Sequence, residues 1–199
     1  MAVSYSYRWR VVDIAVASVV AVASAFIFWI AAMLYPAVSA VLEPLIPGLT
    51  GSINGLWLFA GPLAAIIVRK PGAALYAELV AAALEAFAGN SWGGIETIGI
   101  ALVQGAGAEL AFALFAWKSY NLAVTTLAGT LAGVGCWLYS FVKDLQAYSL
   151  TSVYGISYVV STLISGAVFA GVITWFLFVA IAHTGALDQF ASGRMVRGK

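Results

Sequence analysis

The chain alternates long apolar segments with short polar breaks. A helix that crosses a bilayer needs about 20 mainly apolar residues, and six segments approach or exceed that length. We predict membrane helices over residues 11–35, 53–68, 72–88, 95–117, 122–142 and 156–182. The second and third are short, and a proline and a glycine at positions 71 and 72 favour a tight turn between them. The pattern predicts an all-α, polytopic bundle of six helices that forms one integral membrane domain over residues 1–199.

Composition supports the membrane assignment. Hydrophobic residues make up 63% of the chain and charged residues 9%, whereas about 25% of residues in soluble domains are charged. The net charge of +1 offers no basic surface for nucleic acid. The single cysteine, Cys136, lies within an apolar run and is expected to be a buried packing residue, so we predict no disulfide, metal cluster or cofactor.

The first apolar segment has some features of a signal peptide. Arg8 and Arg10 precede it, and small residues at 23–25 could form a cleavage site. Because apolar residues continue to Tyr35, the segment is longer than a signal core of about 7 to 15 residues. We therefore expect a retained first helix.

The basic residues predict the orientation, because lysine and arginine concentrate on the cytoplasmic side of membrane proteins. With six helices, Lys143 falls on one side, and all the other basic residues fall on the side of the two termini: Arg8, Arg10, Arg69, Lys70, Lys118, Arg194, Arg197 and Lys199. Both termini are expected in the cytoplasm.

Four polar side chains lie inside the third and fourth segments. A charged group at the bilayer centre costs at least about 2.5 kcal/mol, so such groups normally face a bundle interior or a cavity. A rise of about 1.5 Å per residue brings Glu85 and Gln104 to similar depth in the outer half of the membrane, and Glu78 and Glu109 to similar depth in the inner half. Without a matching cation, the inner pair is expected to be structural, with at least one carboxyl protonated.

The outer pair is the better candidate for a ligand site. Asn90 follows the third segment, and five aromatic residues are expected at the outer ends of the helices: Trp57, Trp92, Trp137, Tyr139 and Tyr154. Some of these aromatic residues are expected to serve only as an interfacial belt. A carboxylate, two amides and several aromatic faces could together bind a small polar or cationic molecule.

Two features of the first half of the chain leave alternatives open. Residues 36–52 could form a partly inserted outer segment that acts as a lid, or a plain connecting loop. Ala17, Ala21 and Ala25 repeat every four residues and form a smooth ridge that permits close helix approach. The ridge could pack inside the protein or dock a second membrane subunit.

Enzyme classes are poorly supported. The only histidine, His183, falls at the end of the last helix with no serine or cysteine beside it, and no GxxxxGKS phosphate loop is present. We predict no catalytic site, so energy for transport would come from an ion gradient or a partner.

The block from residue 69 to residue 109 resembles the YkoE family. The motifs that carry the resemblance are Arg69-Lys70-Pro71-Gly72-Ala73-Ala74, Glu78-Leu79, Glu85, Gly89-Asn90 and Gln104-Gly105-Ala106-Gly107-Ala108-Glu109, in a chain of six helices and about 200 residues. Members of this family are substrate-binding S components of energy-coupling factor (ECF) transporters, associated with thiamine or its hydroxymethylpyrimidine (HMP) precursor. The similarity covers essentially the whole chain.

The resemblance implies a division of labour in a bacterial cell membrane. The S component binds the vitamin from outside, while a transmembrane T component and two ATPase domains supply the energy. It also favours the docking role for Ala17, Ala21 and Ala25, since S components meet the T component through such a ridge. The alternative is a stand-alone proton-coupled carrier that uses Glu78 and Glu109 as a proton relay.

Overall fold

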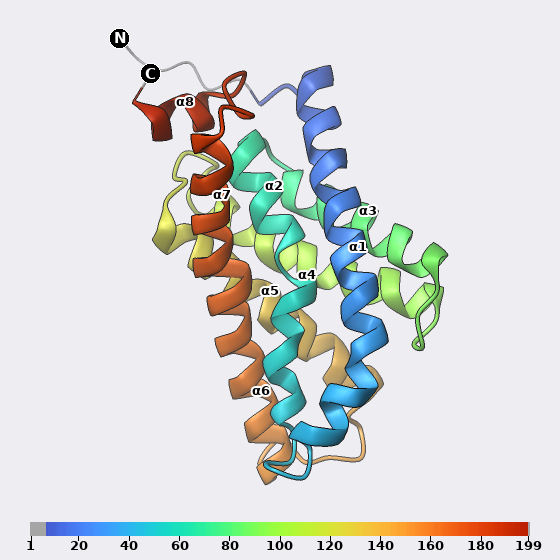
Figure 1. The fold of residues 1–199 in the computed structure, drawn as a ribbon. Helices are drawn as coiled ribbons and strands as arrows, with labels where there is room; N and C mark the ends of the chain where they lie inside the picture. The colour runs from blue at the N-terminus through green and yellow to red at the C-terminus, as the bar shows by residue number, and fades with distance from the viewer. Residues whose placement is uncertain (1–6, 199) are drawn as a thin grey trace.

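The computed structural model describes residues 7–198, and within that range all regular structure is helical. The helices form an elongated bundle in which the start of the first helix and the last helix lie at the same end (Figure 1). In chain order the elements are α1 (Val11–Leu42), η1 (Leu49–Trp57, a 3-10 helix), α2 (Ala60–Val68), α3 (Ala73–Ala88), α4 (Gly94–Leu114), α5 (Leu122–Lys143), α6 (Val153–Ser165), η2 (Gly166–Ile173, a π-helix), α7 (Thr174–His183) and α8 (Ala191–Arg197).

Five helical rods among the described residues are long and apolar enough to cross a membrane. They are α1, the joined η1 and α2, α4, α5, and the continuous α6, η2 and α7. The sixth bundle helix, α3, has 16 residues and packs against α4 and α1. The predicted all-α, polytopic membrane fold is confirmed.

The segment between the first two predicted helices differs from both alternatives considered for it. α1 continues through Pro36 to Leu42. A membrane helix packed among others tolerates the loss of the one backbone hydrogen bond that proline removes. The Glu43 carboxylate then closes the turn by accepting hydrogen bonds from the Gly48 amide at 3.0 Å and the Thr50 hydroxyl at 2.7 Å. η1 re-enters the bundle and packs against α6. The segment is partly inserted, but it forms part of the wall and is not a separate lid.

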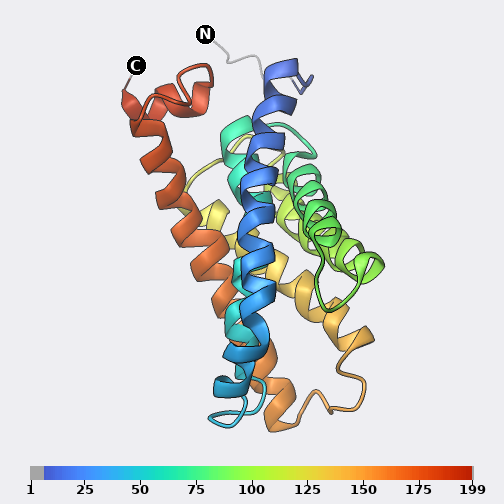
Figure 2. The same cartoon turned by 45° about the vertical axis from the view of Figure 1, so that its right-hand side comes forward.

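The docking role predicted for the alanine ridge of α1 is wrong. Ala17 and Ala21 are fully buried and Ala25 nearly so, inside the protein's own core. Ala21 and Ala25 share a cluster with alanines of α2 and α3, and α1 lies beside α3 (Figure 2). The small side chains serve internal packing, because they let α2 and α3 approach α1 closely.

Glycines bring helix backbones into direct contact in the second half of the bundle. A Cβ added at Gly129 of α5 would lie 2.3 Å from the Gly166 carbonyl oxygen, and one added at Gly166 would lie 2.4 Å from the Gly129 carbonyl oxygen. Gly55 of η1 is similarly close to Ser165, whose hydroxyl accepts a hydrogen bond from the Gly55 amide at 2.8 Å. These contacts set the spacing of η1 and α5 against the junction of α6 and η2.

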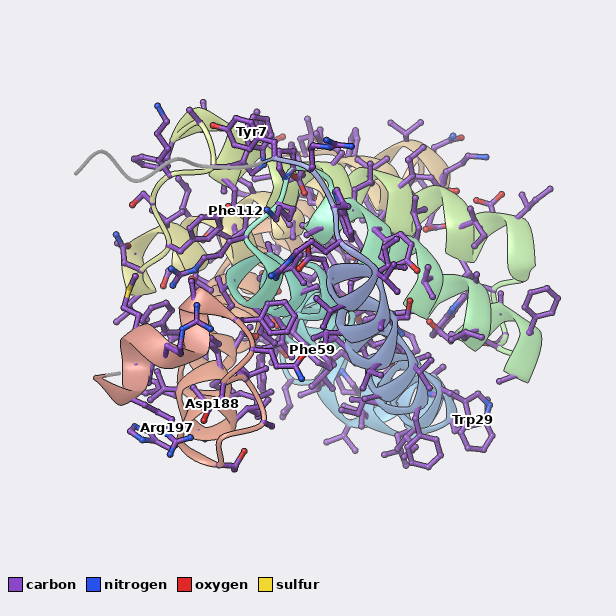
Figure 3. All side chains as sticks on the ribbon, turned by 90° about the horizontal axis from the view of Figure 1, so that it is seen from above. Tyr7, Trp29, Phe59, Phe112, Asp188 and Arg197 are labelled. Carbon is purple, nitrogen blue, oxygen red and sulfur yellow. The ribbon has the colours of Figure 1, made fainter. Side chains whose placement is uncertain are left out.

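The segments that carry most of the basic residues gather at one end. The Arg10 guanidinium lies 5.6 Å from the centre of the Phe190 ring, the Arg69 guanidinium approaches the Met195 sulfur at 3.9 Å, and the Tyr7 hydroxyl donates to the Ala116 carbonyl. Figure 3 views the bundle onto this end, where Tyr7, Asp188 and Arg197 lie near the rim. Lys143, in contrast, is the last residue of α5. Lys199, which was assigned to the basic side, is outside the described residues.

Candidate functional site

A cavity of about 450 Å³ lies in the half of the bundle away from the chain termini. Its walls come from the far part of α1, η1, α3, the start of α4, the end of α5 and the start of α6. The lining residues are Phe28, Tyr35, Asn54, Trp57, Glu78, Ala82, Glu85, Trp92, Glu96, Thr97, Ile100, Ala101, Gln104, Cys136, Tyr139, Ser140, Asp144, Leu145, Tyr154 and Tyr158. The volume falls in the range of about 300 to 1,000 Å³ that is typical of small-molecule sites.

The cavity is acidic. Four carboxylates line it, and in the part of the chain that the structure describes no lysine or arginine does so: Glu78, Glu85, Glu96 and Asp144. Lys143 lies next to it, with its ammonium group 3.4 Å from Glu96 Oε1. Because a low-dielectric wall strengthens the field of these groups, the cavity favours a cationic ligand.

Three aromatic rings from separate parts of the chain form one corner of the cavity. Tyr35, Trp57 and Trp92, called here the aromatic triad, contact one another edge-to-face, with ring centroids 6.2 Å apart for Tyr35 and Trp57, 5.3 Å for Tyr35 and Trp92, and 5.8 Å for Trp57 and Trp92. Aromatic faces gathered in this way attract cations, quaternary ones included. The triad therefore adds a second feature that suits a positive charge.

Glu85 lies beside the triad and is almost completely buried. Its Oε1 accepts a hydrogen bond from the Asn90 amide at 3.2 Å and a longer one from the Trp57 indole at 3.4 Å. Asn90 also donates to the Thr97 hydroxyl at 2.8 Å. These contacts hold the carboxyl group in place, so it can meet a ligand without a change of rotamer.

Glu78 lies two turns earlier on the same face of α3 and also lines the cavity. Its Oε2 accepts a hydrogen bond of 2.7 Å from the Gly61 amide of α2, whereas its Oε1 is buried without a hydrogen-bond partner among residues 7–198. Gln104 of α4 and Cys136 of α5 lie next to each other on the adjoining wall. The structural role predicted for Glu78 therefore describes only one of its two oxygens.

A polar network that was not predicted from the sequence lies at the wall formed by η1, α5 and α6. The Asn54 amide donates to the Tyr158 and Thr162 hydroxyls, both at 3.0 Å, and Tyr158 donates to the Ser140 hydroxyl at 3.3 Å. Asn54 could have been predicted for the same reason as Gln104, because each is an amide side chain within a predicted membrane helix. The face of α6 had a signal too, because polar residues recur there every three or four positions from Tyr154 to Ser165.

The open end of the cavity carries the remaining acids. Glu96 accepts a short hydrogen bond from the Tyr139 hydroxyl and pairs with Lys143, which links α4 to α5. Asp144 follows directly after α5, and its pKa is raised above the ordinary value by partial burial and by the nearby Glu96 charge. The acidic character thus extends from the interior to the mouth.

The structure brings together six of the eight predicted ligand residues around one cavity: Glu85, Gln104, Trp57, Trp92, Tyr139 and Tyr154. Asn90 does not line it but supports Glu85. Trp137 does not line it either and packs against Phe141 of its own helix. Tyr35 is not among the predicted residues, because in the sequence it only ends an apolar segment and nothing there indicates that α1 brings it to Trp57 and Trp92.

Glu109, the second inner acid, does not line the cavity and does not pair with Glu78. Its carboxylate accepts hydrogen bonds from the backbone amides of Gly72 at 2.7 Å and Ala74 at 3.0 Å and from the Trp117 indole at 2.6 Å. Since the first amides of a helix have no partner within it, Glu109 supplies acceptors for the start of α3. This arrangement gives no support to a proton relay that joins Glu78 and Glu109.

Replacing Glu109 by glutamine is expected to lower the stability of the protein by about 1 to 2 kcal/mol, because the amide retains one acceptor oxygen but turns its NH2 group towards a backbone N–H. Thermal unfolding of the purified variant in detergent measures this loss. Ligand affinity of the folded variant should match that of the wild type. A stability equal to that of the wild type would show that Glu109 is not needed as an acceptor for the start of α3.

Comparison with known proteins places the chain in a family. Residues 12–135 match the family model described as "ABC-type cobalt transport system, permease component". YkoE of Bacillus subtilis (strain 168), whose provisional name is HMP/thiamine permease protein, is 35% identical over 193 residues, which cover 96% of this chain and 94% of YkoE. The chain belongs to the YkoE family.

A solved structure supports the same assignment. The crystal structure of an S-component of an ECF transporter superposes with a TM-score of 0.85 at 34% identity, and the match covers 96% of this chain and 94% of that chain. The predicted YkoE resemblance and the ECF S-component fold are confirmed. The family also confirms that this member is a transport subunit and not an enzyme.

The description of the family model names cobalt, which raises the question of a cluster of metal-ligating side chains. Among residues 7–198, no group of three or more histidine, cysteine, aspartate or glutamate side chains could hold a metal ion together. The cavity instead offers separate carboxylates, an amide, hydroxyls and aromatic faces, which are typical of sites for organic ligands.

Proposed function

We propose that this protein captures thiamine or its HMP precursor as the substrate-binding S component of an ECF transporter. The observation that carries the proposal is an acidic cavity with an aromatic corner, formed by the triad and Glu85. The comparisons suggest the substrate class, since YkoE is named for HMP and thiamine and the matching solved structure is that of an ECF S component.

Thiamine has two parts that suit this cavity. Its thiazolium ring carries a permanent positive charge, which the carboxylates and the aromatic faces attract, the latter by about 0.5 to 2 kcal/mol for each close ring. Its aminopyrimidine ring has both hydrogen-bond donors and acceptors, which match the carboxylates and amides. HMP contains the pyrimidine part alone.

The distribution of charges supports an orientation for the proposed function. With the basic end of the bundle in the cytoplasm, both termini are cytoplasmic and the cavity opens outwards, so the ligand is captured from outside the cell. A transmembrane T component and two ATPase domains would then bind the protein and supply energy, since the chain has no phosphate-binding loop of its own.

Ligand binding to the purified full-length protein tests the proposal. Thiamine and HMP at increasing concentration are expected to raise the unfolding temperature, because a ligand that binds only the folded state stabilises it by mass action. Pantothenate, an anionic vitamin of similar size, is the control and is expected to have no effect. If neither thiamine nor HMP changes the unfolding temperature or gives heat in isothermal titration, the proposed substrate is wrong.

Uptake by cells tests the proposed partners. Cells that express this protein together with an ECF T component and its ATPases are expected to accumulate thiamine, and a substitution that inactivates the ATPase should abolish that uptake. Uptake that persists with the inactive ATPase and is lost on adding a protonophore would instead indicate a stand-alone carrier.

A further inference from the structure

Two neighbouring rods of the bundle change helix type at the same level (Figure 1). The rod of α6 and α7 contains η2, which is eight residues of π-helix between two α-helices. The rod of η1 and α2 changes from a 3-10 helix to an α-helix at Leu58 and Phe59. A Cβ added at Gly166, the first residue of η2, would lie 3.3 Å from the Leu58 side chain, so the two joints lie side by side. Such changes of helix type often mark hinges or functional sites.

The joint between η1 and α2 lacks part of the backbone hydrogen bonding of a continuous helix. Pro62 has no N–H group, so it cannot donate to the Leu58 carbonyl as the fourth residue along an α-helix would. The Gly61 amide donates to Glu78 of α3 at 2.7 Å. Two of the amides that could tie η1 to α2 are thus missing or engaged elsewhere, which lowers the resistance of this joint to bending.

The second joint, η2, rests on the backbone of α5. A Cβ added at Gly129 would lie 2.3 Å from the Gly166 carbonyl oxygen and 2.6 Å from the Gly171 amide nitrogen. The Phe169 carbonyl accepts bonds from the amide and, at 2.9 Å, from the hydroxyl of Thr174, five residues further on. The backbone contact with α5 fixes the position of the joint and places no side chain in between that would resist rotation.

On one side of the joints, η1 and α6 form a single unit. The Asn54 amide donates to the Tyr158 hydroxyl at 3.0 Å. The Ser165 hydroxyl accepts a hydrogen bond from the Gly55 amide at 2.8 Å and donates one to the Ser52 carbonyl at 2.6 Å. Since these bonds run along the length of the pair, the two helices are expected to move together.

On the other side of the joints, α2, α7 and α8 are anchored in the core. All nine residues of α2 are buried. The Ser192 hydroxyl of α8 donates to the Ile67 carbonyl of α2 at 2.7 Å. Phe178 and Ala182 of α7 belong to the same hydrophobic cluster as α2. A fixed part and an outer part therefore meet at the two joints.

We propose that η1 and α6 swing together about these two joints and so open and close one wall of the cavity. The pair contributes four lining residues: Asn54, Trp57, Tyr154 and Tyr158. Its hydrogen bonds to α5 and α3 are long, at 3.3 Å from Tyr158 to Ser140 and 3.4 Å from Trp57 to Glu85. This inference rests on the proposed function, because it explains how a ligand enters the cavity.

The connection of the pair to α1 can yield as well. The turn after α1 is bonded to the start of η1 through Glu43 and Thr50, so the end of α1 has to follow the pair. Pro36 lies inside α1, seven residues before this turn, and removes one backbone hydrogen bond of the helix. The part of α1 that must move is therefore separated from the buried part by a weakened point.

Cys136 reports the opening in the unaltered protein without any ligand. It is the only cysteine of the chain, is 3% exposed, and lies near Tyr158 in the wall of the cavity. A small methanethiosulfonate reagent is expected to react with this thiol at a rate that follows the population of the open form. Because no ligand is added, the result does not depend on whether thiamine is the substrate.

Deletion of Val168 tests the joint in η2. Val168 is exposed, and the loss of one residue lets the rest of η2 form the shorter i→i+4 bonds of an α-helix. The stiffer rod is expected to slow the reaction of Cys136 at least about fivefold. Val168→Ala shortens the same side chain but keeps the number of residues, so this control should react at the wild-type rate.

Pro62→Ala tests the joint between η1 and α2, and it decides the matter should the deletion variant fail to fold. Alanine restores an N–H group for the Leu58 carbonyl and is expected to slow the reaction at least about threefold. Wild-type rates in the folded joint variants, or a wild-type thiol that does not react, would overturn the swinging wall and leave the proposed function standing. Thiamine and HMP without effect on the unfolding temperature would overturn the proposed function, whatever the rates.

Discussion

Replacing Glu85 by glutamine is expected to weaken thiamine binding by about 30-fold or more. Removing one member of a buried charge pair typically costs about 2 kcal/mol or more, and 1.4 kcal/mol corresponds to a tenfold change in affinity. Glu85 is buried beside the triad, and glutamine keeps its size while removing the charge. Isothermal titration of the two purified proteins measures the difference.

The affinity for the precursor HMP shows whether Glu85→Gln acts by removing a charge or by damaging the structure. HMP has no thiazolium, so its affinity for the Glu85→Gln variant is expected to remain within about threefold of the wild-type value. Asp188→Asn, which removes an acid at the opposite end of the bundle where Asp188 pairs with Arg197, should leave both affinities unchanged. An equal loss of HMP and thiamine affinity in Glu85→Gln would show that Glu85 does not recognise the cation.

Replacing Gly129 by valine is expected to destabilise the protein by about 3 kcal/mol or more, so that little folded protein can be purified. Added side-chain volume in a packed interior typically costs about 1 to 3 kcal/mol, and more where nothing can move. At Gly129 the obstacle is backbone, since a Cβ there would meet the Gly166 carbonyl oxygen at 2.3 Å. Size-exclusion chromatography in detergent and thermal unfolding measure the outcome.

A glycine without such a neighbour provides the control for this prediction. Gly94 begins α4, and the nearest heavy atom to an added Cβ there is 3.9 Å away, which is ordinary contact. Gly94→Ala is expected to change the unfolding temperature only slightly. If Gly129→Val yields as much folded protein as Gly94→Ala does, the close contact of α5 with η2 is not needed for the fold.

The polar residues inside the helices could be predicted because their cost in lipid is a property of the sequence itself. Glu85 and Gln104 lie in segments that are otherwise apolar, so each had to face the interior, and helix rise alone brought them to a similar depth. Both line the cavity. The same reasoning placed Glu78 and Glu109 together, although they lie in different environments, because depth does not specify the direction in which a side chain points.

The alanine ridge shows the limit of pattern alone. Spacing of four residues predicted that a helix would pack closely on Ala17, Ala21 and Ala25, and helices do pack there. Which helices they are depends on the rotation of α1 about its axis, which brings the ridge against α2 and α3 of the same chain. A partner and an internal neighbour look alike in sequence.

The sequence by itself determined the membrane class, the approximate positions of the helices, the end that collects the basic residues and the buried acids of α3. Each of these follows from the preference of single segments for lipid or water, which does not depend on distant parts of the chain. Only the tertiary structure decided that Tyr35 joins Trp57 and Trp92, that Asn54 donates to Tyr158, and that Glu78 Oε1 has no hydrogen-bond partner among residues 7–198. Those facts depend on contacts between segments far apart in the chain, and a few ångströms of helix position create or abolish them.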